Sequence, residues 1–178
     1  NSITHGLGAL FSAFGLIYLL INSIQDGTIW HIVSFSIFGC SLILLYSAST
    51  LYHSIQKVNY KKLLRKFDHS AIFLLIAGSY TPFLLVSLRG VWGWSLFVIV
   101  WSLAITGIIL KFKFISRFHK LSVGIYVFMG WLVVVAANEI ALKLDNETII
   151  YLFAGGLFYT LGVGFYIWKK LPYNHAIW

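Results

Sequence analysis

The chain has 178 residues, of which 60% are apolar and only 10% are charged. In soluble domains about a quarter of all residues are charged, so this composition excludes an ordinary soluble protein. The formal net charge is +8, yet the chain contains no polar segment that could form a nucleic-acid-binding module. The composition therefore indicates an integral membrane protein.

Six stretches are long and apolar enough to cross a bilayer, because a hydrocarbon core about 30 Å thick needs roughly 20 apolar residues per helix. They cover residues 5–24, 29–53, 68–88, 91–112, 121–142 and 148–168, and a seventh starts near Pro172 and stops at Trp178. The first residue is Asn1 rather than Met, so we expect a piece of a longer protein. We predict an all-α polytopic helix bundle of seven-helix architecture, with residues 1–178 forming one integral-membrane domain.

Basic residues fall almost entirely in loops on one side of the predicted membrane. That side holds Lys57, Lys61, Lys62, Arg65, Lys66, Lys111, Lys113, Arg117, Lys120, Lys169 and Lys170. The opposite side keeps Arg89 and Lys143. Short basic loops remain in the cytoplasm, so the pattern predicts a multi-pass protein of the plasma or inner membrane with a cytoplasmic amino terminus. Anionic lipid is the expected contact of these loops.

The longest connection, residues 54–67, is basic and could lie as a short amphipathic helix on the inner leaflet. Within the third stretch, Gly78 and Pro82 predict a kink. Neighbouring polar residues could either line a cavity above Asp68 or only join helices; they are Ser79, Tyr80 and Thr81.

A candidate metal site combines residues at three span ends on the cytoplasmic side. His53 closes the second span, Asp68 opens the third and His175 opens the seventh. Ser49 precedes His53 by four residues and so shares its helical face. Catalytic zinc takes three protein ligands and a water, which a carboxylate can hold or deprotonate. The spacing suggests Zn²⁺ held by His53 and His175, with Asp68 and Ser49 as catalytic residues.

Simpler interpretations compete with this site. A histidine at a membrane boundary is commonly an interfacial side chain, which is our interpretation of His5, His31 and His119. His69 projects about 100° away from Asp68 on a helix and is not expected to be a ligand. The Ser49 hydroxyl could merely bond a carbonyl of its own helix.

Several separated motifs resemble one known family. They are Ser49-Thr50-Leu51-Tyr52-His53, Asp68-His69-Ser70, Ala77-Gly78-Ser79-Tyr80-Thr81-Pro82-Phe83, Gly130-Trp131 and Pro172-Tyr173-Asn174-His175-Ala176-Ile177-Trp178. In this order they resemble the hemolysin III family, the bacterial branch of the progestin and adipoQ receptors, which is more remotely similar to alkaline ceramidases. The resemblance extends from Asn1 to the last residue.

The resemblance implies a seven-helix bundle with zinc near the cytoplasmic face. The family's Ser-x-x-x-His motif maps onto Ser49 and His53, and its acid maps onto Asp68, acting through a zinc-bound water. A His-x-x-x-His motif on span seven begins at His175, and its second histidine falls just beyond Trp178. Two imidazoles should hold zinc less firmly than a complete set.

The ceramidase-like relatives imply a zinc-dependent hydrolase acting on a lipid amide, with membrane lipids as partners and no nucleic acid. Whether the protein is an enzyme stays open at this stage. One alternative is a membrane-permeabilising haemolysin that forms a pore. Another is a seven-helix receptor or sensor in which zinc is structural.

Overall fold

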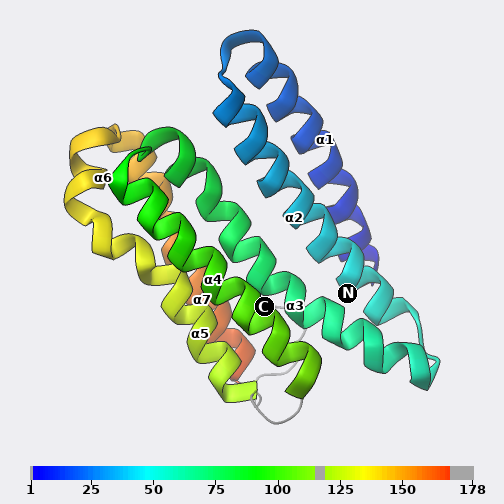
Figure 1. Cartoon of the computed structure of the whole chain (residues 1–178). Helices are drawn as coiled ribbons and strands as arrows, with labels where there is room; N and C mark the ends of the chain where they lie inside the picture. Colours follow the sequence, from blue (N-terminus) through cyan, green and yellow to red (C-terminus); the bar gives the residue numbers. More distant parts are fainter. Residues whose placement is uncertain (1, 115–118, 169–178) are drawn as a thin grey trace. The chain divides into compact units, whose positions relative to one another are not determined.

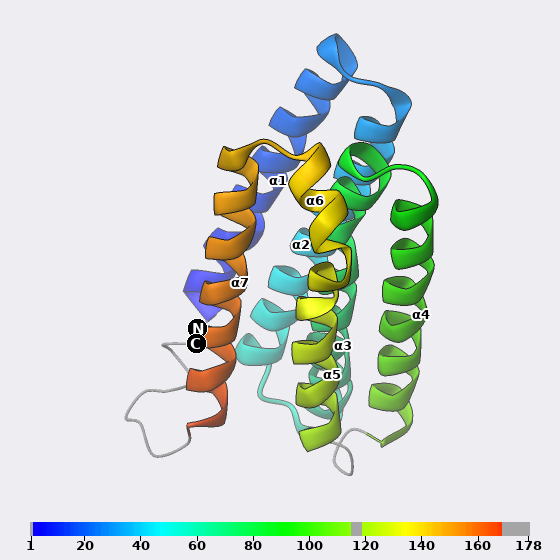
Figure 2. The ribbon, with the colours of Figure 1, turned by 90° about the vertical axis from the view of Figure 1, so that its left-hand side faces the viewer.

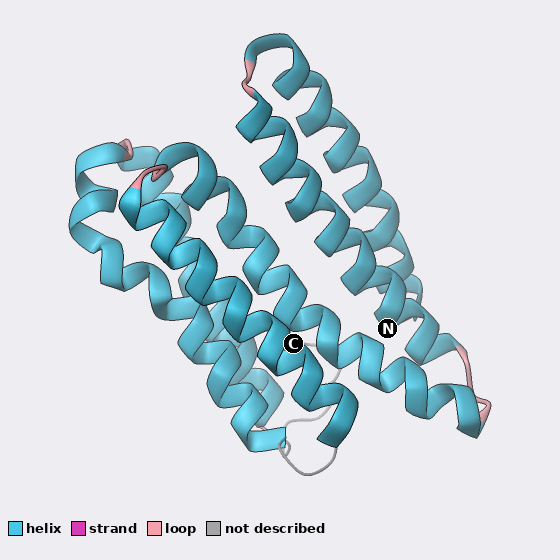
Figure 3. Ribbon diagram, in the orientation of Figure 1, coloured by secondary structure: helices cyan, strands magenta, loops and turns pink. Residues whose placement is uncertain are grey.

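The computed structural model describes residues 2–114 and 119–168, and this part of the chain is helical apart from short turns (Figure 3). The first elements are α1 (Ser2–Asp26), α2 (Ile29–Ser54), α3 (Val58–Pro82), a π-helix η1 (Phe83–Ser87) and α4 (Val91–Phe114). The later elements are α5 (His119–Trp131), a 3₁₀-helix η2 (Leu132–Ala136), α6 (Ala137–Lys143) and α7 (Asn146–Ile167).

Six helical segments in the described residues are long and apolar enough to cross a membrane, which confirms the all-α polytopic prediction. They are Ser2–Asp26, Ile29–Ser54, Val58–Ser87, Val91–Phe114, Leu121–Lys143 and Asn146–Phe165. The predicted start of the seventh span lies outside the described residues.

The helix that contains the third predicted span begins earlier than the span itself. Helix α3 begins at Val58 rather than at Asp68, so the basic stretch is the first part of a continuous helix. Lys, Leu and Arg are good helix formers, and neither Gly nor Pro separates them from the apolar part. Asp68 therefore lies within a helix and not at its start.

Contacts between residues group the chain into two compact units, Asn1–His119 and Lys120–Trp178. The assignment of residues 1–178 to one domain stays a prediction. In the first unit, α1 packs on α2, α2 on α3 and α3 on α4 (Figure 1). The order in the chain is thus also the order of packing.

Small residues allow α1 and α2 to approach closely. A Cβ atom placed on Gly8 would lie 2.9 Å from the ring of Tyr46, and one on Gly39 would lie 2.8 Å from Cβ of Leu16. Helices in lipid associate largely through such close van der Waals contacts, because apolar surface gains nothing by leaving lipid. These glycines therefore fix how the two helices face each other.

Three of the buried hydroxyl groups in the first unit are examples of bonding to the same helix. Ser12 donates to the Gly8 carbonyl at 2.6 Å, and Ser23 donates to the Leu19 carbonyl at 2.6 Å. In α3, Thr81 donates to the Ala77 carbonyl at 2.8 Å. Each hydroxyl is thereby satisfied without water, so these serines and threonines act as small packing residues.

The segment after Pro82 departs from α-helical hydrogen bonding. The Leu88 N–H donates to the Phe83 carbonyl at 2.8 Å, which spans five residues as in a π-helix. Proline removes a backbone donor and crowds the preceding turn, so a local change of register is expected nearby. Trp101 of α4 donates to the Thr81 hydroxyl at 3.2 Å, which favours the interpretation that Thr81 joins helices.

A tight turn connects η1 to α4. Gly90 has a φ of 142°, a conformation that side chains other than glycine's rarely adopt. The Arg89 guanidinium lies 5.4 Å from the ring centroid of Trp30 at the start of α2. Trp30 in turn makes an edge contact with Trp94, with 5.7 Å between centroids. The turn is therefore held against α2 by a cation and two aromatic rings.

In the second unit, η2 and α6 connect α5 to α7 (Figure 2). A Cβ atom on Gly130 of α5 would lie 2.6 Å from the Tyr159 ring of α7. Helix α7 begins after an N-cap: Asp145 accepts hydrogen bonds from the Thr148 N–H at 2.8 Å and the Thr148 hydroxyl at 2.7 Å. This cap satisfies a backbone donor that the first helical turn would otherwise leave free.

Replacing Gly93 by alanine is expected to destabilise the first unit. The added Cβ would overlap the Leu84 carbonyl oxygen and lie 2.6 Å from that of Leu88. Both are backbone atoms of the η1 region, so they cannot move aside as a flexible side chain can. We expect a loss of about 1–3 kcal/mol in unfolding free energy, measured by heating the detergent-solubilised protein and following tryptophan fluorescence.

Gly155→Ala is the matched control, since a Cβ atom there meets nothing within 4 Å. Alanine has the higher helix propensity, so this variant should be at least as stable as the wild type. Equal stability of the Gly93 and Gly155 variants would contradict the close approach of α4 to η1.

The Asp145 cap is expected to make the stability of the protein depend on pH in the acidic range. The hydrogen bonds from the Thr148 N–H, and then from its hydroxyl, lower the pKa of Asp145 below its ordinary value. A lowered pKa stabilises the folded state above the ordinary carboxyl range, and this contribution disappears as the pH falls through the folded-state pKa. Asp145→Asn keeps a capping oxygen but does not titrate, so its melting temperature should fall less steeply in acid. Identical acid profiles of the variant and the wild type would exclude the cap as a titrating group.

Candidate functional site

His53 lies in the last turn of α2, where its ring packs beside Tyr52 at 4.9 Å between centroids. Ser49 lies one turn deeper on the same helix and is only 5% exposed. The Thr50 hydroxyl donates to the Tyr46 carbonyl of the same helix at 2.7 Å. Within the described residues, the Ser49 hydroxyl makes no such bond to its own helix. The pattern Ser-x-x-x-His therefore places an imidazole and a buried hydroxyl on one helical face.

His5 of α1 makes an edge contact with His53, with 5.9 Å between ring centroids and 78° between ring planes. Its ring also contacts Tyr46 of α2 at 5.9 Å. Asp68 of α3 is close enough for its charge to act on His5. Three consecutive helices thus bring two imidazoles and a carboxylate to the same end of the first unit.

His5 was interpreted from the sequence as an ordinary interfacial side chain, and the structure gives it a more central place. Its Nδ1 atom is buried and has no hydrogen-bond partner among the described residues. The signal was available, because antiparallel neighbours place the start of one span beside the end of the next. His5 and His53 occupy those two positions.

The other histidines of the chain are His31, His69, His119 and His175. His31 lies at the start of α2, where its Nδ1 accepts a hydrogen bond from the Thr28 N–H at 3.1 Å. Its interfacial role stays a prediction. His69 follows Asp68 on α3 and is partly buried. The side chain of His119 and the whole of His175 lie outside the described residues.

The donor types at this end suit zinc, which accepts imidazole nitrogen and carboxylate oxygen. The buried Nδ1 of His5 is an additional nitrogen without a described partner. Across residues 2–114 and 119–168, however, no group of three or more His, Cys, Asp or Glu side chains could by itself hold a metal ion. The assignment of His53 and His175 as ligands, and of Asp68 and Ser49 as catalytic residues, therefore stays a prediction.

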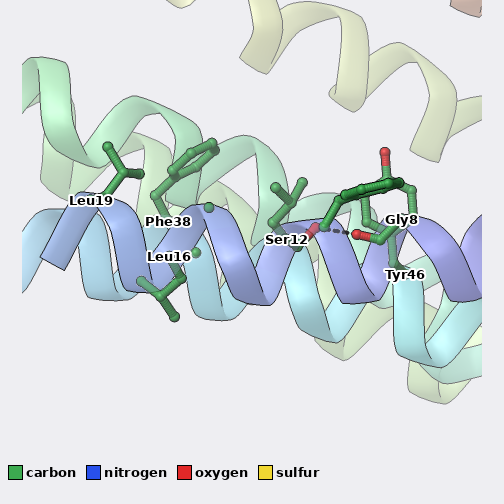
Figure 4. A pocket seen from close by; sticks show the side chains of 10 residues that line it. Gly8, Ser12, Leu16, Leu19, Phe38 and Tyr46 are labelled. Atoms are coloured by element: carbon green, nitrogen blue, oxygen red, sulfur yellow. Dashed lines mark hydrogen bonds between the residues drawn. The ribbon is translucent and has the colours of Figure 1, made fainter. Parts of the chain in front are cut away.

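An open apolar groove of about 380 Å³ runs along α1 and α2 (Figure 4). The labelled lining residues are Gly8, Ser12, Leu16, Leu19, Phe38 and Tyr46. The Ser12 hydroxyl is bonded to Gly8 and so presents no free donor to the groove. Tyr46 lines the groove and also contacts His5, which connects the groove to the histidine pair.

The six apolar helices among the described residues define the class of this molecule as a multi-pass α-helical membrane protein. The family model described as "Haemolysin-III related" matches residues 1–178. The chain therefore belongs to the haemolysin-III family, and the resemblance seen in its motifs is confirmed.

Relatives of known name agree with this assignment. The chain is 51% identical over 178 residues to "Hemolysin-3 homolog" of Bacillus subtilis (strain 168), covering all of the chain and 84% of that protein. It is 50% identical over 178 residues to "Hemolysin-3" of Bacillus cereus, covering 81% of that protein. Human "Monocyte to macrophage differentiation factor" is 30% identical over 171 residues, covering 89% of the chain and 68% of that protein. No solved structure matches the chain.

Proposed function

We propose that this protein is a zinc-dependent membrane hydrolase that cleaves a lipid amide at the end of the first unit where α1, α2 and α3 meet. The observation that carries the proposal is the contact of His53 with His5 beside the charge of Asp68. Ionisable groups within membrane helices are expensive to maintain and usually serve a function. Ser49, Tyr46 and the apolar groove supply polar and apolar contacts next to this pair.

In the proposed reaction, each of these residues has a separate role. His53 and His175 would hold zinc, which supplies a positive charge that polarises a carbonyl. Asp68 takes a proton from the attacking water and returns it to the leaving amine, so the amide bond breaks without a net change of charge on the enzyme. The Ser49 hydroxyl donates a hydrogen bond to the carbonyl oxygen as negative charge develops on it.

The groove along α1 and α2 would receive the acyl chain of the substrate. It extends from Gly8 to Leu19, which is about 16 Å along a helix at 1.5 Å per residue. That length corresponds to about half of a hydrocarbon core 30 Å thick, which is the depth of one leaflet. An acyl chain in this groove would place its polar linkage near Tyr46 and His5.

The proposal predicts separable effects of two substitutions in the purified complete protein. His53→Ala should remove most of the bound zinc, whereas Asp68→Asn should retain it and reduce lipid-amide turnover by about 100-fold or more, as expected for loss of a general acid–base group. Zinc is measured by elemental analysis, and turnover by release of fatty acid from a panel of lipid amides in detergent. His31→Ala is the control, because His31 lies at the other end of α2.

The same assay tests the groove. A Cβ atom at Gly15 meets nothing within 4 Å, so Gly15→Leu should fold, fill the groove and raise KM more than it lowers kcat. Stoichiometric zinc without turnover of any lipid amide would reject the hydrolase and leave a receptor with structural zinc. Dye release from liposomes that is indifferent to His53→Ala would instead support a pore former.

We also propose that the amino terminus is cytoplasmic in the plasma membrane. In a Cys40→Ala background, a cysteine at Lys62 should react with a membrane-impermeant maleimide only after cells are permeabilised, since basic loops stay inside. A cysteine at Ser87, beside the turn that precedes α4, should react in intact cells. Both positions are exposed, so the reverse labelling pattern would overturn this orientation.

A further inference from the structure

The beginning of α3 and the end of α4 bring several cations together. Lys111, in the last turn of α4, is only 2% exposed. Arg65 of α3 is exposed and close enough for its charge to act on Lys111. Lys66, the next residue of α3, is partly buried at the same contact. This basic cluster, Arg65, Lys66 and Lys111, lies at the end of α4 and about two turns from the start of α3.

Lys66 has a structural partner. Its ammonium donates to the Phe112 carbonyl of α4 at 2.8 Å. Immediately beside it, the Phe67 and Phe112 rings meet edge to face at 5.2 Å between centroids. This contact links α3 to α4 and explains why the cluster is held together. The hydrogen bond from Lys66 also satisfies one of the carbonyl groups at the end of α4.

Among the described residues, no comparable partner compensates the charge of Lys111. The charged group that acts on it is Arg65, which carries the same sign. Withdrawing an ammonium from water without a counter-ion is unfavourable, and a neighbouring like charge adds to that cost. The dipole of α4 favours a cation in its last turn, but this effect is small and falls off within one turn.

Among the described residues of the first unit, no ion pair joins a carboxylate to this cluster. The described carboxylates of the first unit are Asp26 and Asp68. Asp26 is the last residue of α1, and the turn from α1 to α2 lies at the opposite end of the first unit from the turn between α2 and α3 (Figure 1). Asp68 acts on His5, and the charge that acts on Lys111 is the Arg65 guanidinium. Within the described first unit, the cluster therefore has no anionic partner of its own.

We propose that Lys111 and Arg65 bind a phosphate group. A guanidinium matches the oxygens of phosphate with two parallel hydrogen bonds, and an ammonium adds a point charge. Lysine commonly buries its methylene stem while the ammonium reaches the surface, so a phosphate at the membrane boundary can meet it. The end of a membrane helix lies at the depth of lipid headgroups, which makes an anionic phospholipid one source and free phosphate the other.

Thermal unfolding of the purified protein in non-ionic micelles tests this site, because a ligand that binds the folded state raises the melting temperature. The micelles carry phosphatidylglycerol, phosphatidylcholine or no lipid, and a fourth sample contains inorganic phosphate without lipid. Wild type should be stabilised by phosphatidylglycerol more than by phosphatidylcholine. Lys111→Met should weaken this response about tenfold or more in lipid concentration. The same variant should melt at or above the wild-type temperature when no anion is present.

Lys113→Gln is the matched control, since Lys113 lies in the same helical turn but is exposed. It should keep the full response. Stabilisation by inorganic phosphate alone, lost in Lys111→Met, would identify free phosphate as the ligand and still support the site. Equal responses of the two lysine variants, whether both retained or both lost, would overturn it. Should Lys111→Met fail to fold, Arg65→Gln must show the same selective loss.

Discussion

A bilayer provides no water to bond the polypeptide backbone, and this constraint governs the structure at every level. It accounts for the helical state of residues 2–114 and 119–168 apart from short turns. It also explains why the hydroxyls of Ser12, Ser23 and Thr81 turn back onto their own helices. Where Pro82 interrupts the regular pattern, the chain changes to π-helical bonding, so the Leu88 N–H still finds the Phe83 carbonyl.

Hydropathy and length were sufficient to predict six spans, because a span must be long and apolar whatever it packs against. They were not sufficient to place the start of α3. Residues 58–67 are too polar to register as a span, yet they are good helix formers and continue into the apolar part without a break. Hydropathy reports where a helix meets lipid, whereas backbone propensity and the absence of Gly or Pro decide where it begins.

The site was predictable only in part. The spacing of Ser49 and His53 fixes their common helical face, and the antiparallel order of the spans brings Asp68 to the same boundary. The contact of His5 with His53 depends in addition on how α1 is rotated about its axis toward α2. That rotation is set by the fit of Gly8 against Tyr46 and of Leu16 against Gly39, which no single-helix pattern contains. The two imidazoles are thus brought together by contacts of Gly8 and Gly39 between the helices.

The turn at Gly90 has a consequence for how the protein is made. Only Leu88, Arg89 and Gly90 separate η1 from α4, so these two helices can hardly enter the bilayer one after the other as independent segments. Their pairing costs little chain entropy because the loop is so short. During synthesis they should leave the translocation machinery as a preformed hairpin with Arg89 at its tip.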